Sequence, residues 1–173
     1  MKRCVSFAVL LLLCLSAFGG CKSSAPPDYL AFQRESFSAE VQGRIGGRAF
    51  GAKIEVEASG EARRVTVTYL SPTVLEGVRI TALCNADGVP NGDCEVTYGD
   101  MTLVRDATEL AGLLSPVSRL LTLSEIATVR RDGDTYILTF SDGAALILDA
   151  NGNPKSLAAK DMELDIVWRE TAK

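Results

Sequence analysis

The feature that most constrains the fold is a period-two alternation of apolar and polar residues. It recurs in the segments 37–42, 54–58, 65–69 and 162–169. Successive side chains of a β-strand point to opposite faces of a sheet, so each segment predicts a strand with one buried and one solvated face. Such one-sided strands are typical of antiparallel sheets.

Turn-forming dipeptides separate these segments. Glycine-containing pairs suited to tight hairpin turns stand at Gly46-Gly47, Asp132-Gly133, Asp142-Gly143 and Asn151-Gly152. In the last third of the chain they predict an antiparallel meander with strands near 126–131, 134–140, 144–149 and 162–169.

Helical patterning is confined to two places. Residues 28–36 predict one short helix before the first strand. In 106–123, Asp106 and Glu109 have the spacing of a capping box, whereas Pro116 predicts a break into two short helices, with Ser115 capping the second. Six apolar residues fall on one face of this pair: Leu110, Leu113, Leu114, Val117, Leu120 and Leu121.

Together these patterns predict an α+β fold, in which short helices cover the concave face of a strongly curved antiparallel sheet. The six apolar side chains would then line a cavity or form its lid. The alternative is that they fill the core and leave no room for a ligand.

The N-terminus has the order of a secretory signal peptide. Lys2 and Arg3 precede the apolar run 5–15, and Gly20 leads into Cys21. A cysteine after two small residues resembles the lipobox of bacterial lipoproteins. That resemblance implies cleavage before Cys21 and a diacylglycerol on its thiol, with acyl chains such as palmitate. An ordinary secreted protein is the alternative, and the apolar run is short for a transmembrane anchor.

Three regions follow from this interpretation: a signal peptide at 1–20, a lipidated N-terminus and flexible tether at 21–28, and one domain at 29–173. The tether holds small polar residues and two prolines. We expect the protein to be lipid-anchored in the cell membrane or outer membrane, facing outside the cytoplasm. The net charge of −4 argues against nucleic acid as a partner.

Two cysteines, Cys84 and Cys94, remain in the mature chain. They flank a segment made almost wholly of turn formers, 85–93, between two alternating segments. In an oxidising compartment they predict a disulfide across a hairpin loop, worth roughly 2–3 kcal/mol in the chain-entropy model.

The chain offers little catalytic chemistry. It has no histidine, which removes the usual general base and the commonest metal ligand. Asp161 and Glu163 could in principle form an acid–base pair or bind calcium, but Glu163 and Asp165 lie on the polar face of an alternating strand, where solvated charge is the ordinary explanation. The basic pairs Arg63-Arg64 and Arg130-Arg131 fit solvated strand edges. We expect a protein that is not an enzyme and needs no cofactor or metal.

The layout resembles the LolA/LolB-like lipoprotein-carrier superfamily. The residues that carry the resemblance lie at 37–41, 67–77, 133–138, 142–143 and 152–157. The resemblance implies a half-open β-barrel whose hollow face holds acyl chains beneath helices.

Two functions remain open at this point. The protein either holds or accepts an apolar ligand, a lipid or the acyl chains of a lipoprotein, or it contacts an envelope protein through the same scaffold with a filled core. A continuous apolar hollow would favour the first role and a filled one the second.

Overall fold

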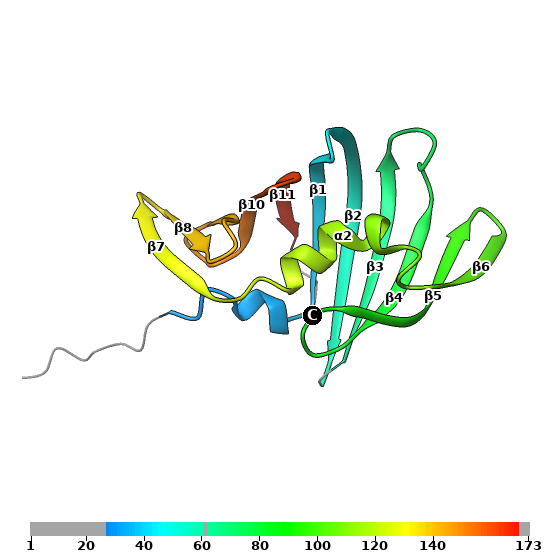
Figure 1. Ribbon diagram of the computed structural model, residues 1–173, viewed down its shortest axis with the longest axis horizontal. Helices are drawn as coiled ribbons and strands as arrows, with labels where there is room; N and C mark the ends of the chain where they lie inside the picture. Colours follow the sequence, from blue (N-terminus) through cyan, green and yellow to red (C-terminus); the bar gives the residue numbers. More distant parts are fainter. Residues whose placement is uncertain (1–26, 61, 170–173) are drawn as a thin grey trace, which may run out of the picture.

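The computed structural model describes residues 27–60 and 62–169, and there the chain forms one antiparallel sheet of 11 strands (Figure 1). The strands are β1 (Phe37–Ile45), β2 (Arg48–Ser59), β3 (Ala62–Ser71), β4 (Arg79–Cys84), β5 (Pro90–Tyr98), β6 (Met101–Asp106), β7 (Ile126–Asp132), β8 (Thr135–Phe140), β9 (Ala145–Leu148), β10 (Pro154–Ala159) and β11 (Met162–Arg169).

The first and last strands pair in the middle of the sheet. The strand order is β6-β5-β4-β3-β2-β1-β11-β10-β9-β8-β7, and Val41 of β1 lies opposite Ile166 of β11. Every other neighbour pair is joined by a hairpin or short turn. The sheet is not closed, because β6 and β7 form its two outer edges.

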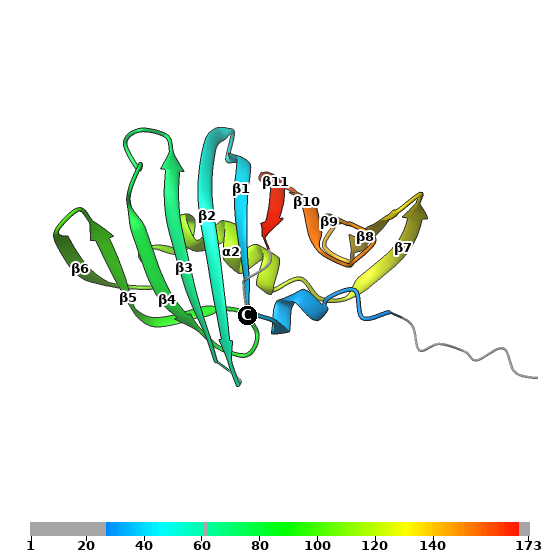
Figure 2. The same ribbon diagram turned by 180° about the vertical axis from the view of Figure 1, so that it is seen from behind.

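This order forces the connection between β6 and β7 to cross the sheet. The connection holds α2 (Ala111–Leu121), which lies in front of the strands in Figure 1 and behind them in Figure 2. The edge strands β6 and β7 lie nearer the viewer than β1 and β2 in Figure 1, so the sheet curves around α2. A short 3-10 helix, η1 (Ala31–Arg34), precedes β1.

The core lies between α2 and the face of the sheet that it covers. Alternate strand residues such as Val41, Ile54 and Ile80 are fully buried, and so are Leu114 and Leu120 of the helix. The alternation therefore predicted the buried face correctly. The four strands expected in the last third are present, as β7, β8, β9 and β11.

The structure corrects the predicted pair of helices. Residues 111–121 form one continuous helix with Pro116 inside it. Pro116 has no N–H to donate to the carbonyl oxygen of Gly112, four residues earlier. The Ser115 hydroxyl donates to that oxygen instead, at 2.8 Å. The carbonyl keeps a partner, and the helix continues through the proline.

The predicted capping box is also absent. Asp106 ends strand β6, and its carboxylate accepts hydrogen bonds from the backbone N–H of Thr108 at 2.8 Å and from the Thr108 hydroxyl at 2.6 Å. These bonds lower the pKa of Asp106. They build a turn after β6, and α2 begins five residues later, preceded by Leu110, which makes no side-chain cap.

Candidate ligand-binding groove

The six apolar residues predicted to line a cavity divide into two groups. Four of them, Leu114, Val117, Leu120 and Leu121, are buried in the core. Leu110 and Leu113 are half-buried at the N-terminal end of α2. The space beneath the middle of the helix is therefore filled by protein side chains, and of the six residues only Leu113, in the first turn of α2, lines the apolar groove described next.

An apolar groove of about 480 Å³ opens at that first turn. Three parts of the fold build it: the β1–β2 hairpin, the end of β3 with the loop after it, and the start of α2. Its lining residues are Ile45, Arg48, Ala49, Phe50, Tyr69, Pro72, Val74, Leu75, Gly112 and Leu113. The volume of the groove lies within the range of about 300–1,000 Å³ that is typical of ligand-binding sites.

Tyr69 fixes the position of the helix relative to this groove. Its side chain is 3% exposed, and its hydroxyl donates a hydrogen bond of 2.7 Å to the carbonyl oxygen of Leu113. Its ring lies 6.4 Å from the ring of Phe50, measured between centroids. Burial raises the pKa of Tyr69 to about 12, so the phenol stays neutral and serves as a donor rather than a base.

The loop after β3 supplies the most exposed large apolar side chain of the groove. Val74 is 83% exposed, whereas its neighbour Leu75 is half-buried against the core. The loop is held by a hydrogen bond of 2.8 Å from the backbone N–H of Leu75 to the carbonyl oxygen of Pro72. Pro72, which also lines the groove, is exposed as well, so this part of the rim presents two nearby apolar side chains to water.

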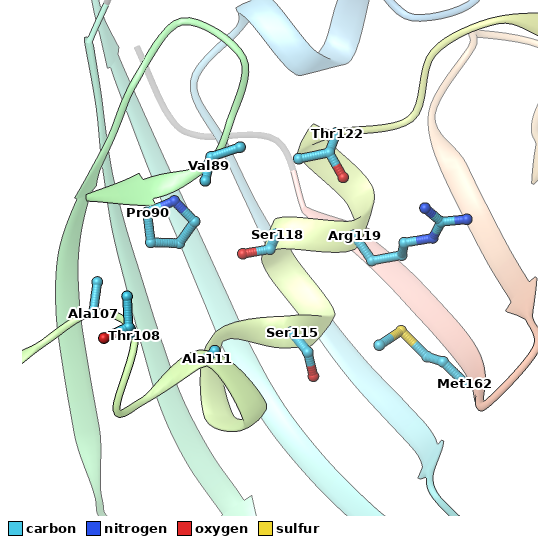
Figure 3. Close-up of a pocket in the computed structure, with 10 residues that line it drawn as sticks. All are labelled: Val89, Pro90, Ala107, Thr108, Ala111, Ser115, Ser118, Arg119, Thr122 and Met162. Carbon is cyan, nitrogen blue, oxygen red and sulfur yellow. The ribbon is translucent and has the colours of Figure 1, made fainter.

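A second pocket, of about 410 Å³, lies on the outer face of α2 and is drawn in Figure 3. Several of its polar groups already have partners within the protein. Ser115 donates to Gly112, Arg119 forms an ion pair with Asp142, and Thr108 donates to Asp106. These three polar groups are therefore already used within the protein.

Cys84 and Cys94 are both buried and are free thiols in the structure. They lie on the neighbouring strands β4 and β5. Burial raises the pKa of Cys84 to about 11, with the Arg63 guanidinium acting in the opposite direction. Burial, together with the carboxylates of Asp106 and Asp93, raises the pKa of Cys94. The thiols are not activated as nucleophiles, and their pairing in a disulfide stays a prediction.

Arg63 corrects the interpretation of the basic pairs. Arg64, Arg130 and Arg131 are exposed, as expected, but Arg63 is 9% exposed. Its guanidinium donates to the carbonyl oxygens of Asn85 at 3.3 Å and Ala86 at 2.6 Å. A buried cation with these two acceptors holds the β4–β5 loop against β3. The alternation along β3 separates the two arginines, because Arg63 falls on the same face as the buried Val65, whereas Arg64 falls on the solvated face.

Within 27–60 and 62–169, no cluster of three His, Cys, Asp or Glu side chains could hold a metal ion. No helix in the same ranges is long and apolar enough to cross a membrane. The predicted signal peptide and the lipidation site at Cys21 lie outside the described residues.

No family model and no curated protein matches this sequence. Among solved structures, it is similar to an uncharacterized conserved protein from Thermus thermophilus, with 15% identity and a TM-score of 0.52 over 83% of this chain and 84% of that one.

Two weaker similarities accompany it. A putative outer membrane lipoprotein-sorting protein domain from Vibrio parahaemolyticus has 9% identity and a TM-score of 0.44 over 83% of this chain and 92% of that one. A LolA superfamily protein from Nitrosomonas europaea has 10% identity and a TM-score of 0.36 over 81% and 88%. The similarity to the Thermus protein shows that the two chains share a fold.

Proposed function

We propose that this protein is a lipoprotein, anchored through Cys21 on the outer side of a membrane, whose domain holds an apolar ligand. The ligand is a lipid or the acyl chain of a lipoprotein, and its site is the groove at the N-terminal end of α2. The domain binds and does not catalyse. We place the site in the groove rather than in a hollow beneath the helices, because buried side chains of α2 fill the space between the helix and the sheet.

The observation that carries this proposal is the groove itself. Of its lining residues only Arg48 carries a charge, and Phe50, Val74, Leu75 and Leu113 offer apolar side chains. Burial of an acyl chain is favourable by about 0.8 kcal/mol for each methylene removed from water. A groove of this composition therefore binds a chain through surface burial alone.

The binding test uses the protein purified from bacterial membranes and returned to phosphatidylcholine vesicles. A photoactivatable palmitate is added, and the labelled fraction is measured by mass spectrometry of the intact protein. Val74→Glu places a carboxylate in the groove, where it opposes apolar burial. Because Val74 is 83% exposed, the variant keeps the fold, and we expect labelling to fall at least fivefold.

Val167→Glu is the matched control. Val167 is also an exposed valine, at 58%, but it lies on β11 beside the buried Ile166, on the other face of the sheet. It should be labelled as the wild-type protein is. Equal labelling of both variants, or no labelling of the wild type, would refute binding in the groove.

The anchor is tested separately. Cells fed an alkyne-bearing palmitate should incorporate it into the wild-type protein and not into Cys21→Ser. Incorporation that survives in Cys21→Ser would disprove lipidation at this cysteine, without bearing on the groove.

A second candidate function, contact with an envelope protein, is favoured by the edge strand β6. All six residues of β6 are exposed, among them Met101, Leu103 and Val104, and it pairs with β5 without a bulge. Such an edge can accept a further strand from a partner. The opposite edge, β7, is protected by Arg130 and Arg131 and by a register shift after Ile126.

This candidate predicts a difference between the two edges. A photocrosslinking amino acid in place of Leu103 should capture one defined protein in cells, and the same group in place of Val129 on β7 should not. Equal capture at both positions would count against strand addition at β6.

A further inference from the structure

The groove has one feature that apolar binding alone does not use, a single cation at its rim. Arg48 begins strand β2, opposite Ile45 in the β1–β2 hairpin, and its side chain is exposed where it lines the groove. No lining residue of the groove is acidic. The positive charge of Arg48 is therefore not neutralised by any other residue that lines the groove.

The rest of the described chain does not engage Arg48 either. The ion pairs among the described residues involve Arg34, Lys53, Arg105, Arg119 and Arg169. None of them includes Arg48. An arginine lays its methylene groups along apolar surface and keeps its guanidinium in water. At the rim of this apolar groove, the guanidinium of Arg48 therefore presents its N–H donors, which have no ion-pair partner among the described residues, beside the entrance.

The other polar group of the groove is committed. The Tyr69 hydroxyl donates its hydrogen to the carbonyl oxygen of Leu113. The guanidinium of Arg48 is therefore the one charged donor that the lining offers to the polar end of a ligand.

We propose that the groove takes a free fatty acid, whose carboxylate pairs with Arg48 while its chain lies against Phe50, Leu75 and Leu113. This inference rests on the proposed function and names the class of its ligand. A guanidinium matches a carboxylate with two parallel hydrogen bonds. A charged head at the rim stays near water, so the pairing does not require burial of the charge.

The size of the groove agrees with a single-chain ligand. Its volume of about 480 Å³ lies in the lower half of the range of about 300–1,000 Å³ for ligand sites.

The test compares two photoactivatable probes with the same chain, hexadecanoate and hexadecanol, on the protein in phosphatidylcholine vesicles at a pH where the acid is ionised. The wild-type protein should prefer the acid by about three- to tenfold, the range expected for a charge-assisted hydrogen bond near the surface. Arg48→Gln should lose this preference and still be labelled by the alcohol. Arg48→Lys should keep part of it.

Arg64→Gln is the control, because Arg64 is also exposed but lies on β3 away from the groove lining. It should show the wild-type preference. Equal labelling of the wild type by both probes, or a preference that survives in Arg48→Gln, overturns the fatty-acid assignment and leaves apolar binding intact. No labelling by either probe overturns the proposed function as well.

Discussion

The hydroxyl of Tyr69 donates a hydrogen bond of 2.7 Å to the carbonyl oxygen of Leu113, and so joins strand β3 to the first turn of α2. The donor lies in the core and the acceptor at the edge of the groove. The bond therefore couples the position of the helix to the shape of the groove, because Leu113 both accepts the bond and lines the groove.

Tyr69→Phe should lower the free energy of unfolding by about 0.5–1.5 kcal/mol, the usual net value of one hydrogen bond. The melting temperature should fall by roughly 2–4 °C for each kcal/mol in a domain of this size. Tyr98→Phe is the control, since Tyr98 is exposed. An equal loss in the two variants would show that the bond from Tyr69 contributes nothing.

A double-mutant cycle tests how α2 passes through Pro116. Ser115→Ala should cost about 1 kcal/mol in the wild-type background, because the carbonyl oxygen of Gly112 loses its donor. In the Pro116→Ala background the new backbone N–H serves that oxygen, so the same substitution should cost almost nothing. Equal costs in both backgrounds, measured by denaturant unfolding, would contradict this role of Ser115.

The pairing of β1 with β11 predicts a strong effect at Gly43. A Cβ atom there would lie 1.9 Å from the carbonyl oxygen of Glu163 on β11. Gly43→Ala should therefore destabilise the protein by about 1–3 kcal/mol or more. Gly112→Ala meets nothing within 4 Å and lies in a helix, where alanine should stabilise by up to about 1 kcal/mol. Thermal unfolding that ranks these variants in the opposite order would refute the register.

The two buried thiols predict a pH dependence that a disulfide would abolish. The pKa of Cys84 is about 11 in the folded protein and about 8.5 in an unfolded chain. The unfolded state then releases its proton first, so the stability of the reduced protein is complete below about pH 8.5. It falls as the pH rises toward 11.

The protein with a Cys84–Cys94 disulfide has no thiol to ionise. Its free energy of unfolding should therefore not show the decrease that thiol ionisation causes in the reduced protein at high pH. The measurement compares unfolding of the reduced and oxidised proteins across this range. Titration of Tyr69 contributes equally to both forms and cancels in the difference. Protein taken from an oxidising compartment should show no free thiol under denaturing conditions, and two reactive thiols there would disprove the predicted disulfide.

The sequence predicted the sheet better than it predicted the site. Alternation identifies a strand because burial on one face is a local, repeated requirement, and segments 37–42 and 162–169 form β1 and β11. Strand β6 was missed because all its residues are exposed, which removes the alternation. The predicted break at Pro116 was wrong because the compensating bond from Ser115 depends on a particular side-chain geometry.

The groove could not be predicted for a different reason. Its lining comes from residues 45–50, 69–75 and 112–113, which are distant in the sequence and meet only in the folded sheet. Helical spacing selected six residues of one face, but only Leu113 of these lines the groove. Periodicity shows which face of a helix is apolar, and not whether the space beneath it is filled.

The most direct test of the central claim is to map where a bound acyl chain lies. The photoactivatable palmitate is crosslinked to the protein in phosphatidylcholine vesicles, and the labelled peptides are sequenced by mass spectrometry. Binding in the groove predicts labels within 45–50, 69–75 and 112–113, which together form its lining. Labels concentrated on residues 114–121, or spread evenly over the exposed strands β6 and β7, would contradict it.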